Sequence, residues 1–158
     1  MSDSLPPIKA IPDSHIGLVE ASPYALLSTL RHSDGLLSVN PVGYTFDGQC
    51  FRISTLKSRV KYRNLQADPR ASLCIVDHND ITVYIEVRGH VTLEDDPDRS
   101  YMAFQFRNKM GVNPPDDLDP PDSERAIPSR CPRPRCTEAV SASPESGRIH
   151  SLSAERAL

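Results

Sequence analysis

The sequence contains no run of about 18 consecutive apolar residues, the length that a membrane-spanning helix needs. Its first residues, Met1 to Pro7, lack the cationic start and apolar run of a secretory signal. The formal net charge of the 158-residue chain is -3, so the molecule as a whole offers no basic field for a nucleic acid. These absences predict a cytoplasmic protein that binds neither a membrane nor a nucleic acid.

The four cysteines do not form a metal-ligand pattern. Cys50 and Cys74 fall in predicted strands, where we expect small core residues. Cys131 and Cys136 flank a Pro/Arg-rich stretch, and His150 is the only further candidate ligand nearby, whereas a zinc site needs more Cys or His at matching spacing. We therefore expect no metal site, and no disulfide in a reducing cytoplasm.

The last part of the sequence has a different composition. From Ala126 to Leu158 there is no Lys, Asp, Phe or Tyr, and Arg, Pro, Ala and Ser dominate without an alternating apolar run, which predicts disorder. Residues 123–127 are typical of the start of a strand, and we expect that strand not to continue. A shift of the coding frame near Arg125 is one hypothesis for this change. It would leave the final strand of the domain missing, and resequencing the locus would test it.

The rest of the chain is long enough for one domain with one core. Short apolar runs separated by the turn residues Ser33-Asp34-Gly35 and Asp47-Gly48 predict strands. We expect strands over 25–31, 36–46, 49–55, 73–77 and 82–93, and helices over 15–21, 58–67 and about 96–110. The division is a flexible arm over 1–14, a folded domain over 15–125, and a disordered or out-of-frame tail over 126–158. Five strands with one inserted helix predict a mainly β fold, a small antiparallel barrel of Greek-key type with short helices.

One predicted strand, over 36–46, contains both Pro41 and Gly43. Proline cannot donate to a central hydrogen-bond ladder, and glycine has no side chain to pack. The strand is therefore expected to bend or bulge where something approaches its backbone. An ordinary bulge of an edge strand is the alternative interpretation.

A basic run is the most informative part of the sequence. Lys57, Arg59, Lys61 and Arg63 fall within seven positions, and no acid interrupts them. Ser58 can cap a helix that ends before Pro69, with Leu56, Val60, Asn64 and Ala67 on the face that packs against the sheet. Cations at a helix N-terminus, where backbone N–H groups are free, are suited to hold a small anion. The alternative is a charged helix face in contact with solvent.

These residues carry a resemblance to a known family. The pattern Ser58-Arg59-x-Lys61-x-Arg63-Asn64-Leu65-x-x-Asp68-Pro69-Arg70-Ala71-Ser72, followed by a strand, resembles the pyridoxamine 5'-phosphate oxidase-like split β-barrel superfamily. More narrowly, it resembles the branch that uses the deazaflavin coenzyme F420. The segment 37–44 before Asp47-Gly48 fits the same branch, and the resemblance covers roughly residues 14–125.

The resemblance implies an FMN-binding split barrel-like fold and a homodimer, with the cofactor in a groove between subunits. It places Arg59 and Lys61 at the cofactor phosphate, with Ser54, Thr55 and Lys57 beside them, and Ser58 at the start of the helix. It places Asn40, Pro41, Val42 and Gly43 along the flat ring system, where a bent strand lets a planar ring approach the backbone.

The activity implied is F420H2-dependent hydride transfer to an unsaturated small-molecule substrate. One alternative is an FMN-dependent oxidase of the pyridoxamine-phosphate type, although residues for a second phosphate are not evident. The other is a non-catalytic flavin- or deazaflavin-binding protein. No Ser/His/Asp or Cys/His constellation is evident, and nothing in the sequence selects His32, His78 or His90 as a proton donor. The catalytic residues and the substrate stay open at this point.

Overall fold

The computed structural model describes residues 11–120, 123–130, 136–142 and 150–152. In chain order the elements are α1 (Asp13–Ala21), β1 (Tyr24–Leu30), β2 (Leu37–Gly43), β3 (Thr45–Phe46), β4 (Phe51–Arg52), β5 (Thr55–Leu56), α2 (Val60–Ala67), β6 (Arg70–Val76), β7 (Tyr84–His90), β8 (Thr92–Asp95), α3 (Ser100–Met110), β9 (Arg125–Arg130), β10 (Cys136–Ala142) and β11 (His150–Leu152). No helix of the described residues is long and apolar enough to cross a membrane.

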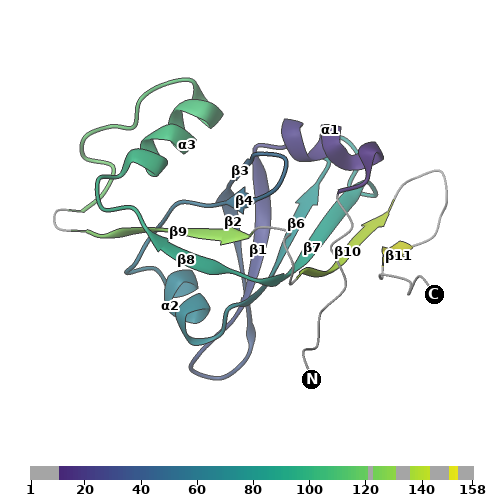
Figure 1. The fold of residues 1–158 in the computed structure, drawn as a ribbon, viewed down its shortest axis with the longest axis horizontal. Helices are drawn as coiled ribbons and strands as arrows, with labels where there is room; N and C mark the ends of the chain where they lie inside the picture. Colours follow the sequence, from purple (N-terminus) through teal and green to yellow (C-terminus); the bar gives the residue numbers. More distant parts are fainter. Residues whose placement is uncertain (1–10, 121–122, 131–135, 143–149, 153–158) are drawn as a thin grey trace.

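The strands form two antiparallel sheets (Figure 1), and α2 contacts β1 of the larger one. The larger sheet has the strand order β11-β10-β7-β6-β1-β2. In the smaller sheet β9 pairs with β4, β5 and β8, and β3 pairs with β4. The structure is therefore mainly β with few short helices, as the sequence predicted.

The core lies between the two sheets because successive residues of a strand point to opposite faces. Along β1, Ala25 and Leu27 are buried, whereas Leu26 is exposed. The buried face continues into Ile75 of β6 and Ile85 of β7. The smaller sheet contributes aromatic residues such as Phe51 to the same cluster.

Three predicted strands are each divided in the structure. Residues 36–46 form β2 and β3, residues 49–55 lie around β4 and β5, and residues 82–93 form β7 and β8. Gly89 near the end of β7 has a φ of 144°, a conformation that glycine adopts readily. The breaks after β2 and after β7 let the chain pass from the larger sheet to the smaller one, whereas β4 and β5 both belong to the smaller sheet. β2 is the last strand of its sheet, where the missing N–H of Pro41 is tolerated.

The start of α2 differs from the prediction. The helix begins at Val60 with Arg59 as its N-cap, and no side chain caps it. The prediction that Ser58 caps this helix is therefore wrong. The buried residues of α2 are Asn64 and Leu65, whereas Val60 is exposed, so the helix packs through a face rotated from the predicted one.

The helix α3 ends as its sequence predicts. Gly111 follows Met110 with a φ of 72°, the left-handed conformation that commonly ends a helix. At its start, the buried Asp96 carboxylate accepts hydrogen bonds from the backbone N–H groups of Tyr101 (3.1 Å) and Met102 (3.0 Å). This carboxylate fixes α3 beside β8.

The segment that follows Arg125 corrects the sequence-based prediction. β9 continues to Arg130 and has strand neighbours on both sides, so the expected end of the strand near Arg125 is wrong. The prediction that the closing strand is missing is also wrong, because β10 pairs with β7, whose backbone groups would otherwise form an open edge. Residues 131–135 lie outside the described residues.

The structure also tests the predictions for the N-terminal arm and for the cysteines. Asp13 and Ser14 belong to α1 and not to a flexible arm, while residues 1–10 of that arm lie outside the described residues. Cys50 is buried, as predicted, but it is disulfide-bonded, so the expectation that the protein has no disulfide is wrong. Cys74 is a free thiol on β6.

Candidate cofactor site

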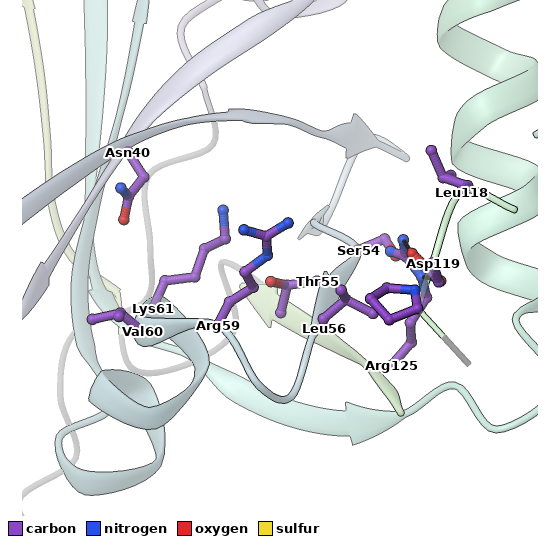
Figure 2. A pocket seen from close by; sticks show the side chains of 11 residues that line it. Asn40, Ser54, Thr55, Leu56, Arg59, Val60, Lys61, Leu118, Asp119 and Arg125 are labelled. Carbon is purple, nitrogen blue, oxygen red and sulfur yellow. Dashed lines mark hydrogen bonds and ion pairs between the residues drawn. The ribbon is translucent and has the colours of Figure 1, made fainter. Parts of the chain in front are cut away.

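A cavity of about 450 Å³ opens where α2 begins, next to β5 and the loop before β9. Its lining combines residues from the middle of the chain with residues from the segment before β9. The lining residues are Asn40, Ser54, Thr55, Leu56, Arg59, Val60, Lys61, Leu118, Asp119, Pro120 and Arg125. Figure 2 shows Arg59 and Lys61 directed into the space between Asn40 and Thr55.

Arg59 and Lys61 give the cavity its charge. Among the described residues, neither side chain has a carboxylate within ion-pair distance. Burial lowers the pKa of Lys61, and the adjacent Arg59 guanidinium lowers this pKa further. Burial disfavours the charged form of the ammonium, and the neighbouring guanidinium repels it. A bound anion would relieve this repulsion.

The helix start supplies further donors at the same place. Because no side chain caps α2, the backbone N–H groups of Val60 and Lys61 have no partner among the described residues, whereas that of Tyr62 donates to the Arg59 carbonyl at 3.1 Å. Val60 and Lys61 of this turn both line the cavity. The positive end of the helix dipole therefore adds to the two side-chain cations.

Thr55 provides a hydroxyl without a partner. The residue is 3% exposed, and its Oγ1 has no hydrogen-bond partner in the described part of the chain. Thr55 lines the cavity beside Arg59 (Figure 2). A buried hydroxyl without a partner costs free energy, so its presence here favours a ligand that completes it.

The opposite wall is held by an ion pair. The Arg125 guanidinium binds both oxygens of the Asp119 carboxylate, and Arg99 lies 3.8 Å from the same group. Arg125 also donates to Ser54 Oγ at 2.8 Å. The Arg125 guanidinium holds the pKa of Asp119 below its usual range. The lining thus carries three cationic side chains and one carboxylate that is already paired, which leaves it positively charged.

The structure brings together half of the ten residues predicted for the site, namely Asn40, Ser54, Thr55, Arg59 and Lys61. Ser58 is exposed and does not line this cavity. Pro41 is exposed on β2, and Val42 is buried in the core. Gly43 lines a neighbouring cavity and not this one.

Lys57 forms ion pairs outside the cavity. Its Nζ lies 2.8 Å from an Asp95 carboxylate oxygen and 2.9 Å from one of Glu124. Hydrogen bonds to these carboxylates raise the pKa of Lys57. Lys57 therefore ties β5 to β8 and to the segment before β9, and it does not line the cavity.

Sequence reasoning missed Asp119 and Arg125. Asp119 lies in the acidic, proline-rich stretch 114–120, and the change in composition places the predicted end of the domain at Arg125. Their ion pair spans a loop whose length gives no periodic signal, so only the fold reveals it.

The cavity does not have the composition of a metal centre. Among the described residues, no group of three or more His, Cys, Asp or Glu could hold a metal ion. The cations, the free helix start and the Thr55 hydroxyl are instead all hydrogen-bond donors, which suits a phosphate.

The comparisons with known proteins agree with this fold. The family model for pyridoxamine 5'-phosphate oxidase matches residues 11–131, and the chain belongs to this family. It has the family's split β-barrel, a fold that binds flavin-type cofactors. The matched region extends beyond Arg125 and includes β9.

Solved structures give the same result. The chain is similar to a protein named F420 reductase, with a TM-score of 0.68, 29% identity, and coverage of 82% of this chain and 98% of that chain. It shares its fold with a pyridoxinephosphate oxidase family protein from Clostridium acetobutylicum, related to general stress protein 26 of B. subtilis (TM-score 0.64, 17% identity, 89% and 92% covered). It also shares its fold with a heme binding protein from Mycobacterium smegmatis (TM-score 0.61, 16% identity, 92% and 60% covered).

Proposed function

We propose that the cavity at the start of α2 holds the phosphate of coenzyme F420, and that the protein is an F420H2-dependent oxidoreductase acting on an unsaturated small molecule. The observation that carries this proposal is the pair of cations, Arg59 and Lys61, directed into one cavity without a carboxylate partner among the described residues. The likeness to an F420 reductase at 29% identity supports the choice of a deazaflavin.

The residues have distinct roles in this proposal. Arg59 and Lys61 bind the phosphate by charge-assisted hydrogen bonds, and the first turn of α2 adds backbone N–H groups. The Thr55 hydroxyl donates to the same group. When bound, the deazaflavin supplies the hydride, and the protein orients it and excludes water. Asn40 in the lining shows that β2 borders the cavity, so the ring system would extend along β2.

The alternative cofactor is FMN, which also carries a phosphate on a flat ring system. The same cavity would serve its phosphate, and the family fold accommodates flavin-type cofactors. A protein that binds either molecule without turnover is the other alternative. The titrations below distinguish FMN from F420. Oxidation of the reduced cofactor in the presence of enones and quinones distinguishes an enzyme from a protein that only binds the cofactor.

We further propose that the protein is a homodimer in which the partner completes the cofactor groove. Leu37 and Val39 of β2 are 70% and 54% exposed, and Leu26 of the adjacent β1 lies on the same outer face. Exposed apolar residues that form such a strip mark an interaction surface. Because side chains alternate along β2, Val39 points to this face while Asn40 lines the cavity from the other face, so only the edge strand β2 would separate a second copy here from the cavity.

The direct test is a titration of F420 and of FMN into the purified protein and into Lys61→Met. Removing one charge-assisted contact is expected to weaken binding of the preferred cofactor by about 1.5–3 kcal/mol, or roughly 10- to 150-fold. Fluorescence of the cofactor or isothermal titration calorimetry measures the affinity.

Arg63→Met is the matched control. Arg63 lies on the same helix, is exposed, and does not line the cavity, so this variant makes the same change in net charge elsewhere. Its affinity should stay within twofold of the parent protein. Equal losses in Lys61→Met and Arg63→Met would show only a general charge effect and would overturn the assignment of the phosphate to this cavity.

A further inference from the structure

A second cavity of about 230 Å³ lies next to the first one. It is formed by the start of β1, the end of β2 and the helix α3. Ser54, Leu118 and Arg125 line both cavities, so the two spaces adjoin at these side chains. A molecule in the second cavity would therefore lie beside a cofactor bound in the first.

The lining of the second cavity is largely apolar. Met102, Phe106 and Met110 from α3 contribute two thioethers and an aromatic ring. Methionine side chains are flexible and polarisable, and they pack well against flat aromatic groups. The volume is below the roughly 300 Å³ at which pockets for drug-sized ligands begin, which favours a molecule of one or two rings.

Lys109 is the cation of this cavity that lacks an ionic partner. Its Nζ donates to the Ser22 carbonyl at 3.2 Å and lies 4.5 Å from the centre of the Tyr44 ring. No carboxylate of the described residues lies within ion-pair distance of it. An ammonium has three donors, so this anchoring leaves donors for a ligand. Burial lowers the pKa of Lys109, and a bound anion would oppose that shift.

The wall between the cavities is fixed by close packing at Gly43. A Cβ at this position would lie 3.0 Å from Gln105 Nε2. The Gln105 Oε1 accepts a hydrogen bond from the Ser54 backbone N–H at 2.7 Å. Glycine at position 43 thus lets α3 approach β2, and the Gln105 amide positions Ser54 between the two spaces. Gly43 and Gln105 both line the second cavity.

We propose that the second cavity is a substrate subsite for a small planar aromatic acid, whose carboxylate or sulfonate binds Lys109 and whose ring packs on Met102, Phe106 and Met110. Its role as the substrate subsite rests on the proposed function, because hydride transfer requires the cofactor in the adjacent cavity. Binding of the acid itself requires only the residues of the second cavity.

The experiment compares 2-naphthoate with the neutral 2-naphthamide, titrated into the full chain without cofactor near pH 7. The protein contains no tryptophan, so the fluorescence of the naphthalene ring can be followed without interference from indole. We expect naphthoate to bind about tenfold more tightly than naphthamide, because only the carboxylate pairs with Lys109. Equal affinities, or no binding of either probe, would overturn the proposal.

Three variants locate the probe. Lys109→Met should remove the preference for naphthoate and leave naphthamide binding unchanged, and Lys109→Arg should retain the preference. Lys61→Met should leave both affinities unchanged, because Lys61 lines only the other cavity. A preference that survives in Lys109→Met, or one that disappears in Lys61→Met, would show that the acid binds elsewhere.

Cofactor titrations into the same preparations separate this proposal from the proposed function. Lys109→Met should bind the cofactor as the parent protein does. If naphthoate binds as described and neither cofactor binds, the proposed function fails while the aromatic-acid site stands. If a cofactor binds and the naphthoate preference is absent, the aromatic-acid site fails alone.

Discussion

Thr55 combines a cost to stability with a proposed role in binding. Its buried Oγ1 has no partner in the described part of the chain, and replacing it with a methyl group removes the unmet hydrogen bond without changing the shape. Thr55→Val should raise the free energy of unfolding by about 1 kcal/mol and weaken cofactor binding. Urea denaturation and a cofactor titration on the same sample measure both effects.

The opposite signs of the two effects are the essential part of this prediction. Ser28→Ala serves as a control, because Ser28 lies on β1 and does not line the cavity. A Thr55→Val protein that is less stable and binds the cofactor normally would show that the hydroxyl has a structural partner and no ligand.

Lys61 determines the pH dependence of binding. Burial and Arg59 lower its pKa, so the side chain loses its proton at a lower pH than an ordinary lysine does. Affinity for the phosphate should therefore be constant around neutral pH and fall as the pH rises through the lowered pKa of Lys61. Lys61→Arg, which keeps its charge at these pH values, should retain its affinity. A parallel alkaline decline in both proteins would exclude Lys61 as the cause.

At the scale of single residues, the sequence predicted two of the three cations that line the cavity, because Arg59 and Lys61 lie together at the start of one helix. Lys57 belongs to the same run, but its partners Asp95 and Glu124 come from distant segments, so the sequence could not show that it is already paired. The Asp119–Arg125 pair was missed because the loop between these residues gives no periodic signal.

Among the elements, β9 and the loop before it close one side of the site. Asp119 is buried, and its carboxylate binds Arg125 and lies near Arg99. Asp119→Asn leaves these guanidinium groups without an anion, and it should lower the free energy of unfolding by about 3 kcal/mol at neutral pH. Thermal or urea denaturation as a function of pH measures this loss.

The sign of the pH dependence follows from the direction of the pKa shift. Because Arg125 lowers the pKa of Asp119 in the folded protein, the carboxylate stabilises the fold at pH values above its ordinary pKa of 3.8. This stabilisation is lost as the pH falls from there through the lowered pKa. The difference between the parent protein and Asp119→Asn should shrink over that acidic range, and a difference that grows there would contradict the assignment.

The sequence predicted the existence of most helices and strands, but not the points at which the predicted strands are interrupted. Turn residues and alternation identified β1, β6 and β7, and Gly111 identified the end of α3. The break between β2 and β3 depends on the passage between sheets, and the break between β4 and β5 lies where both strands pair with β9; both are tertiary effects. β9 was missed because its buried residues are Ala126, Pro128 and Ser129, which do not form an alternating pattern of large apolar residues.

For the whole molecule, the exposed apolar strip on β1 and β2 predicts the oligomeric state. Val39→Asp places a charge in the proposed dimer interface and should convert the dimer to a monomer. Ile81→Asp is the control, because Ile81 is 79% exposed but lies outside the strands. Analytical ultracentrifugation distinguishes the two species. A parent protein that is monomeric, or a Val39→Asp protein that remains dimeric, would contradict the proposed interface.

The family and the fold class were accessible from the sequence because the motif at the start of α2 and the order of strands are both local features. The two adjoining cavities were not accessible, because their walls combine β2, α3 and the segment before β9. Such a site exists only once the chain has folded.

The measurement that tests the account most directly is the dependence of binding on the phosphate. FMN is compared with riboflavin, and F420 with the deazaflavin chromophore that lacks the phosphate, in the parent protein and in a variant carrying Arg59→Met and Lys61→Met. The account predicts that the phosphorylated form of the preferred cofactor binds at least about tenfold more tightly, and that the variant loses this preference. A folded protein that binds both forms equally, or binds neither cofactor, would contradict it.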